Sequence, residues 1–163
     1  MSGQLKNLKL EIKTVIQIQK PVETVFEAIV DPAKMSNYFI ADGSGRMDEN
    51  KELIWHFPEF AVDIPVHVEK IEKDSYISFY WNGAKDKKLR VEMSLRSVGA
   101  TDTVLTITEK EMENDEAGIK WLKSNTEGWA NFSACLTAYL EYEINLRKGA
   151  FDFMKGKEPV AEK

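Results

Sequence analysis

Polar and apolar residues alternate along most of the first two thirds of the chain, and this period of two predicts strands. From Lys6 to Gln19 the even positions are mostly apolar and the odd positions mostly polar, as in a strand with one buried face. Further strands are expected at 62–68, 76–81, 89–95 and 103–109, with two shorter ones around 45–47 and 52–57. Tight turns separate them, and Asn82-Gly83 is the strongest hairpin signal. Successive strands joined in this way predict an antiparallel meander.

Two short helices are expected between the first strand and the meander. Pro21 suits the first helical position, and the apolar residues that follow recur at helical spacing: Val22, Val25, Phe26 and Ile29. Asp31 can cap a second short helix that Pro32 opens. Each helix should bury one face.

A long amphipathic helix is predicted at the C-terminal end, from Ser124 to Gly149. Ser124 and Glu127 have the spacing of a capping box, and Lys148-Gly149 supplies a stop. One side of this helix carries Leu122, Trp129, Phe132, Ser133, Leu136, Leu140 and Glu143. A stripe this wide needs an apolar partner surface, which the sheet can provide.

The expected fold class is therefore α+β, with the long helix packed on a curved antiparallel sheet. One domain should span residues 6–154, between a loose N-terminal tail at 1–5 and a disordered polar tail at 155–163. A length of 163 residues, 43% of them hydrophobic and 30% charged, is typical of one soluble globular domain with its own core.

Charge and cysteine content narrow the possible partners. A net charge of −5 leaves no basic excess for nucleic acid or for an anionic membrane surface. The single Cys135 cannot form an internal disulfide, which fits a reducing compartment, and its apolar neighbours favour a buried structural thiol. Without a signal peptide or a membrane-spanning stretch, the expected location is the cytoplasm.

Motifs that carry chemistry are scarce. The sequence contains no glycine-rich phosphate loop, no metal-ligand spacing of His and Cys, and no nucleophile elbow, so neither a metal nor a cofactor is expected. The acidic run 109–116 is interpreted as a solvated connection, since it lacks the ligand spacing of a calcium loop. His56 and His67 are interpreted as structural or solvated.

Glu143 leaves two alternatives open. In the apolar seam of the helix, burial would raise its pKa, as is common for functional carboxylates. Alternatively the seam has reached solvent at that point, or Arg147 pairs with Glu143 four residues earlier.

Aromatic residues are the most informative candidates for a site. Six of them could face the space between sheet and helix: Trp55, Phe57, Phe79, Trp81, Trp129 and Phe132. They could form an ordinary core, or they could line a concave apolar pocket of the kind that binds small molecules. In the second case Met93, Leu136 and Glu143 complete the predicted ligand-binding set.

Two stretches carry a family resemblance. PVETVFEAIVDPAKMSNYF at 21–39 resembles the opening pattern, and EGWANFSACLTAYLE at 127–141 the closing helix, of one branch of the START-like (SRPBCC) superfamily with its helix-grip fold. That branch is the group related to the activator of the heat-shock chaperone ATPase. The resemblance implies a cavity between the sheet and the last helix, which superfamily members use for lipids, hormones and polyketides. It supplies no uniform catalytic motif.

Three functional hypotheses follow. The first is a non-enzymatic intracellular protein that binds a hydrophobic small molecule or lipid in the cavity. The second is a chaperone-associated domain that binds a protein. The third is an enzyme acting on a polyketide-like substrate, with Glu143, His56 or Tyr80 as acid or base.

Overall fold

The computed structural model describes residues 8–84 and 87–156. The strands are β1 (Leu10–Ile18), β2 (Asp42–Gly43), β3 (Glu52–His56), β4 (Ile64–Glu72), β5 (Tyr76–Ala84), β6 (Lys87–Val98) and β7 (Asp102–Met112). The helices are α2 (Val22–Val30), α3 (Pro32–Met35) and α4 (Glu116–Tyr142), and η1 (Asp152–Met154) is a 3-10 turn. The expected tail at 1–5 lies outside the described residues, as do residues 157–163 of the other tail.

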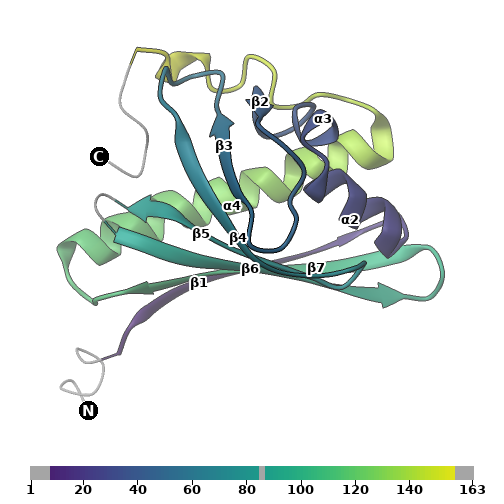
Figure 1. Cartoon of the computed structure of the whole chain (residues 1–163), viewed down its shortest axis with the longest axis horizontal. Helices are drawn as coiled ribbons and strands as arrows, with labels where there is room; N and C mark the ends of the chain where they lie inside the picture. The colour runs from purple at the N-terminus through teal and green to yellow at the C-terminus, as the bar shows by residue number, and fades with distance from the viewer. Residues whose placement is uncertain (1–7, 85–86, 157–163) are drawn as a thin grey trace.

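The strands form one antiparallel sheet of seven strands in the order β1-β7-β6-β5-β4-β3-β2. Helix α4 lies across one face of this sheet, and α2 and α3 lie beside the C-terminal half of α4 (Figure 1). The first strand pairs with the last, which places β1 at the edge that α4 contacts most. The predicted α+β helix-grip arrangement is confirmed.

The hairpin expected at Asn82-Gly83 is wrong in detail. Strand β5 continues through both residues, with Asn82 opposite Lys88, Ala84 opposite Lys87, and a bulge between them. Strand pairing has overridden the local turn preference of an Asn-Gly pair. The first short strand is also displaced, since β2 pairs with β3 at Asp42–Gly43 rather than around 45–47.

The two short helices form where they are predicted, although Pro21 is the N-cap of α2 rather than its first helical residue. The Asp31 carboxylate accepts a hydrogen bond from the N–H of Ala33 at 2.9 Å, so it caps α3 in the expected way. Helix α2 buries Val25, Phe26 and Ile29 against the sheet side of the molecule.

Both ends of the long helix differ from the prediction. Helix α4 begins at Glu116, because the side chain of Asp115 accepts a hydrogen bond from the N–H of Gly118 and caps it. The Ser124 capping box therefore lies inside the helix. The helix ends at Tyr142, where Glu143 takes a left-handed conformation with φ 55° and its N–H bonds to the last carbonyls. Burial of Trp121 by the sheet gives the added turns their packing.

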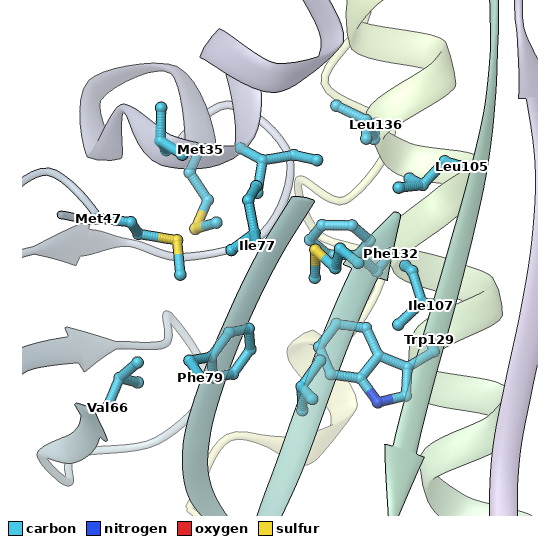
Figure 2. Packing of buried hydrophobic residues seen from close by; sticks show 14 of the residues in the cluster. Met35, Met47, Val66, Ile77, Phe79, Leu105, Ile107, Trp129, Phe132 and Leu136 are labelled. Carbon is cyan, nitrogen blue, oxygen red and sulfur yellow. The ribbon is translucent and has the colours of Figure 1, made fainter. Parts of the chain in front are cut away.

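The core lies between the sheet and α4. Figure 2 shows Trp129 and Phe132 projecting from α4 toward Phe79 of β5 and Ile107 of β7, with Leu136 one turn further along. The alternation predicted for β6 is correct, since Leu89, Val91, Met93 and Leu95 are all buried. No helix in the described part of the chain is long and apolar enough to span a membrane.

After α4 the chain turns back, in yellow in Figure 1, toward the ends of β3 and β4. We call residues 143–154 the C-terminal strap. It contains the turn η1, and its side chain Arg147 reaches Glu59 in the loop between β3 and β4. The strap replaces the last turns of the predicted helix.

Candidate functional site

A cavity of about 420 Å³ lies between β5, α4, the loop between β3 and β4, and the C-terminal strap. Nine aromatic side chains dominate its wall: Tyr38, Phe39, Phe57, Phe60, Trp81, Trp129, Phe132, Phe151 and Phe153. Exposed residues at its rim, among them Glu127 and Phe153, show that the cavity opens to the surface. We call the deep part beside Trp81 and Trp129 the floor, and the part beside the strap the mouth.

The floor consists of closely packed aromatic rings, some tilted against each other and some edge to face. Phe39 contacts Trp129 and Phe132 with ring centroids 6.0 and 4.8 Å apart. The rings of Trp81 and Trp129 lie 5.6 Å apart at an angle of 40°. Such pairs add about 0.5–1.5 kcal/mol each beyond the area they bury, so the floor is a rigid surface.

Behind the floor lies a buried carboxylate, Glu109 of β7, whose side chain is fully shielded from solvent. Its Oε2 accepts a hydrogen bond from the indole N–H of Trp81 at 2.6 Å. Its Oε1 accepts bonds from the side-chain N–H groups of Trp121 at 3.2 Å, Asn125 at 2.9 Å and Trp129 at 3.3 Å. The three α4 residues are four positions apart, so they share one face of the helix.

Burial and hydrogen bonding have opposite effects on the pKa of Glu109. Burial raises the pKa of Glu109, and the bonds from Asn125 and the three indoles act in the opposite direction. All four partners are donors, and an indole N–H cannot accept a proton. The set of partners therefore matches the carboxylate form of the side chain.

Gly83 makes room for this carboxylate. A Cβ at position 83 would collide with Oε2 of Glu109 and lie 2.8 Å from Cδ1 of Leu89. The carbonyl of Gly83 accepts a second bond from the Asn125 amide at 2.9 Å. The Asn-Gly pair that resembles a turn thus serves the close approach of β5 to Glu109.

An ion pair holds the strap at the mouth. Arg147 of the strap donates to the carboxylate of Glu59, with side-chain exposures of 16% and 4%. The guanidinium also lies over the rings of Phe57 and Phe151, at 5.8 and 4.7 Å from their centroids. The pair links the end of the chain to the loop between β3 and β4.

Eight of the nine predicted ligand-binding residues divide into two groups, and the ninth, Glu143, belongs to neither. Four of them line the cavity: Phe57, Trp81, Trp129 and Phe132. Four others are buried in the core around it, namely Trp55, Phe79, Met93 and Leu136. Their role toward a ligand stays a prediction.

Glu143 does not lie in the helix seam. It is exposed at the C-cap of α4, because the helix ends there, and Arg147 pairs with Glu59 instead. The alternative in which the seam has already reached solvent describes its position.

None of the residues considered for acid–base chemistry lines the cavity. His56 lies on the outside, bonded to Asp42 at 2.6 Å and Asp63 at 2.7 Å, and these bonds raise its pKa. Tyr80 points to Glu69 on the outer face of the sheet. Among the described residues, those that line the cavity include neither His56, Tyr80 nor Glu143.

Cys135 behaves as expected of a structural thiol. It is buried in α4 beside the cavity, and burial raises the pKa of its thiol, so the reactive thiolate is disfavoured. No group of three or more potential metal ligands occurs within the described residues. His67, on the outer face, binds Glu52.

The interpretation of the acidic run 109–116 as a solvated connection is wrong at its start, because β7 continues to Met112 and buries the first residue of the run. Glu109 continues β7 and shares the inner face with Leu105 and Ile107, all of them buried. The alternation of the strand, extended by one step, would have placed Glu109 inside.

Comparison with known proteins identifies relatives. A family model described as Activator of Hsp90 ATPase homolog 1-like protein matches residues 19–141. The crystal structure of protein SSP2350 from Staphylococcus saprophyticus superposes with a TM-score of 0.74 at 30% identity, over 85% of this chain and 96% of that one. No curated protein sequence matches the chain.

Two more distant structures share the fold. The Aha1 dimer from Colwellia psychrerythraea has a TM-score of 0.68 at 16% identity, over 82% of this chain and 97% of that one. DynU16, a protein of the dynemicin biosynthetic locus, has a TM-score of 0.72 at 20% identity, over 83% of this chain and 48% of that one. This chain therefore spans about half of DynU16.

Proposed function

The chain belongs to the family of Activator of Hsp90 ATPase homolog 1-like proteins, and from that premise we propose that it binds an apolar small molecule or lipid in the cavity without catalysing its conversion. The observation that carries the proposal is the cavity of about 420 Å³ with its aromatic wall. Small-molecule sites have about 300–1,000 Å³ and are mostly apolar with few polar groups.

The wall favours burial of apolar area over polar recognition. The indole N–H groups of Trp81 and Trp129 are already bonded to Glu109, so each offers the cavity its ring carbons. A ligand would gain about 25 cal/mol for each Å² of apolar surface it buries. This gain does not depend on a reacting group, which fits a binding protein.

Gly128 of α4 allows a clean test, because it lies in the cavity wall and a Cβ there would meet nothing within 4 Å. Gly128→Phe should fill the rim of the cavity without disturbing the core. Gly128→Ala is the matched control, since it removes the same helical glycine and adds only one methyl group.

The measurement is a titration with N-phenyl-1-naphthylamine, a neutral apolar dye that becomes fluorescent in apolar surroundings. Wild type and Gly128→Ala should bind it with similar affinity, and Gly128→Phe at least tenfold more weakly. Equal binding by all three folded proteins would refute the cavity as the site.

Docking on a protein is the second candidate, favoured by the family match itself. It predicts that a chaperone ATPase of the host binds wild type and Gly128→Phe equally well in a pull-down, because the cavity would then be incidental. Equal capture together with an absence of dye binding would favour this candidate over the first.

A further inference from the structure

The charges around the cavity are mostly negative. Glu59 and Glu127 are part of its wall, and Glu109 lies directly behind two of its indole rings. Arg147 is the one cationic side chain among the described residues of the wall, and its charge is neutralised by Glu59. A charged group on a ligand would therefore lie near two carboxylates outside that ion pair, Glu127 at the rim and Glu109 behind the indoles.

The two indoles of the floor transmit part of the Glu109 charge. Trp81 and Trp129 both direct their N–H groups to the same carboxylate. A hydrogen bond from an N–H to an anion polarises the donor, and this moves electron density into the ring. The faces of these rings are already negative, so they become stronger partners for a cation.

The low dielectric of the site increases these effects. Glu109 is fully shielded from solvent and Trp129 nearly so, and charges interact more strongly there than at the surface. The remaining cavity-facing aromatic groups, such as Phe39 and Phe60, give an apolar body of a ligand its contact area. An aromatic cavity backed by carboxylates is suited to an organic cation.

We propose that the cavity selects ligands that join an apolar body to an alkylammonium or arylammonium group, over neutral and anionic ligands of the same shape. This inference rests on the proposed function, since it names the class of molecule that the same cavity takes. The cationic group would lie over Trp81, whose ring is partly exposed whereas that of Trp129 is buried, and the apolar body would lie toward Phe57 and the mouth.

Three probes of similar size test the inference at pH 8: benzyltrimethylammonium, its neutral carbon isostere neopentylbenzene, and the anion 3-phenylpropanoate. Intrinsic tryptophan fluorescence and calorimetry report binding. The cation should bind wild type at least tenfold more tightly than the neutral isostere, and the anion most weakly. A neutral isostere that binds as tightly as the cation, or an anion that binds more tightly, overturns the inference.

Two variants test which carboxylate gives the cavity its preference for a cation. Glu109→Gln should reduce the advantage of the cation at least threefold, measured within that variant as the ratio of the dissociation constants of the neutral isostere and the cation. If Glu109→Gln does not fold, Glu127→Gln at the exposed rim should reduce the advantage about twofold. Full retention of the advantage in the folded variant overturns the role assigned to that carboxylate.

The outcomes separate this inference from the proposed function. Binding of the neutral isostere without preference for the cation refutes the inference alone and keeps the cavity as a site. Failure of all three probes and of N-phenyl-1-naphthylamine refutes both.

Discussion

Two buried carboxylates, Glu109 at the floor of the cavity and Glu59 at its mouth, are held in opposite ways. Glu109 receives four neutral N–H donors from β5 and α4, in the middle of the fold. Glu59 receives one cation, Arg147, from the C-terminal strap. Another strap residue, Phe153, is 69% exposed. The floor therefore shares the stability of the core, whereas the mouth can open at a lower cost.

This difference assigns separate roles to the floor and the mouth of the cavity. In the proposed binding role, a rigid floor would fix the shape and the charge that a ligand meets. The strap is held to the loop between β3 and β4 by the Arg147–Glu59 ion pair and the contact of Arg147 with Phe57, and its release would widen the entry for a ligand. Substitutions at the floor should therefore lower the stability of the whole fold, whereas substitutions at the mouth should mainly affect the strap.

The largest effect is expected at the floor. Glu109→Ala leaves three indole N–H groups without their acceptor and removes one of the two acceptors of the Asn125 amide, and each unpaired buried donor costs about 1–3 kcal/mol. The free energy of unfolding in urea should fall by at least about 3 kcal/mol. Glu113→Ala, at an exposed carboxylate just beyond β7, is the control and should change it by less than about 1 kcal/mol. If Glu109→Ala lowers the free energy of unfolding no more than Glu113→Ala does, the floor is not rigid in the way described.

Gly83→Ala should come second. The added methyl group collides with Glu109 Oε2 and presses on Leu89, and overpacking of this kind costs about 1–3 kcal/mol. Gly128→Ala adds the same group in open space on α4 and should stabilise the protein by about 0.5–1 kcal/mol. Thermal unfolding of the two variants should shift in opposite directions. A shift in the same direction would remove the packing argument for Gly83.

At the mouth, Arg147→Met should affect local opening more than global stability. It removes the partner of Glu59 but keeps an apolar side chain beside Phe57 and Phe151. The expected loss is about 1–2 kcal/mol, because Glu59 can regain water when the strap moves. Hydrogen exchange should accelerate at amides of 144–154 and stay unchanged in β7. Adding Glu59→Gln should recover part of the loss; acceleration throughout the sheet would contradict a separable strap.

The smallest effect concerns pH. Because burial raises the folded-state pKa of Glu109, its proton stabilises the fold fully at pH values below the unfolded pKa near 4.5. This contribution is lost as pH rises through the folded pKa, by at most about 1.4 kcal/mol per pH unit. The stability of wild type relative to Glu109→Gln should therefore decrease as pH rises above about 4.5. An increase would mean that the four donors outweigh burial.

Much of this structure can be predicted from the sequence, and the predictions that fail do so for physical reasons. Alternation in 89–95 and the helical spacing of Trp129, Phe132 and Leu136 predict the sheet, the helix and the shared core. Asn82-Gly83 misleads because glycine serves both turns and close approaches, and only the position of Glu109 decides between them.

The two carboxylate sites illustrate what local patterns omit. Glu109 could have been found, since it follows Leu105 and Ile107 on the inner face of one strand. Glu59 and Arg147 are 88 residues apart, and no periodicity relates them. Four of the predicted ligand-binding residues lie in the cavity wall and four in the core, because alternation assigns a face and not a depth.

Native mass spectrometry of the protein purified from its own host tests the central claim most directly. If the cavity holds a ligand, wild type and Gly128→Ala should carry an added mass that Gly128→Phe lacks, and mild unfolding should release it. The same added mass on Gly128→Phe, or none on wild type, would contradict the account.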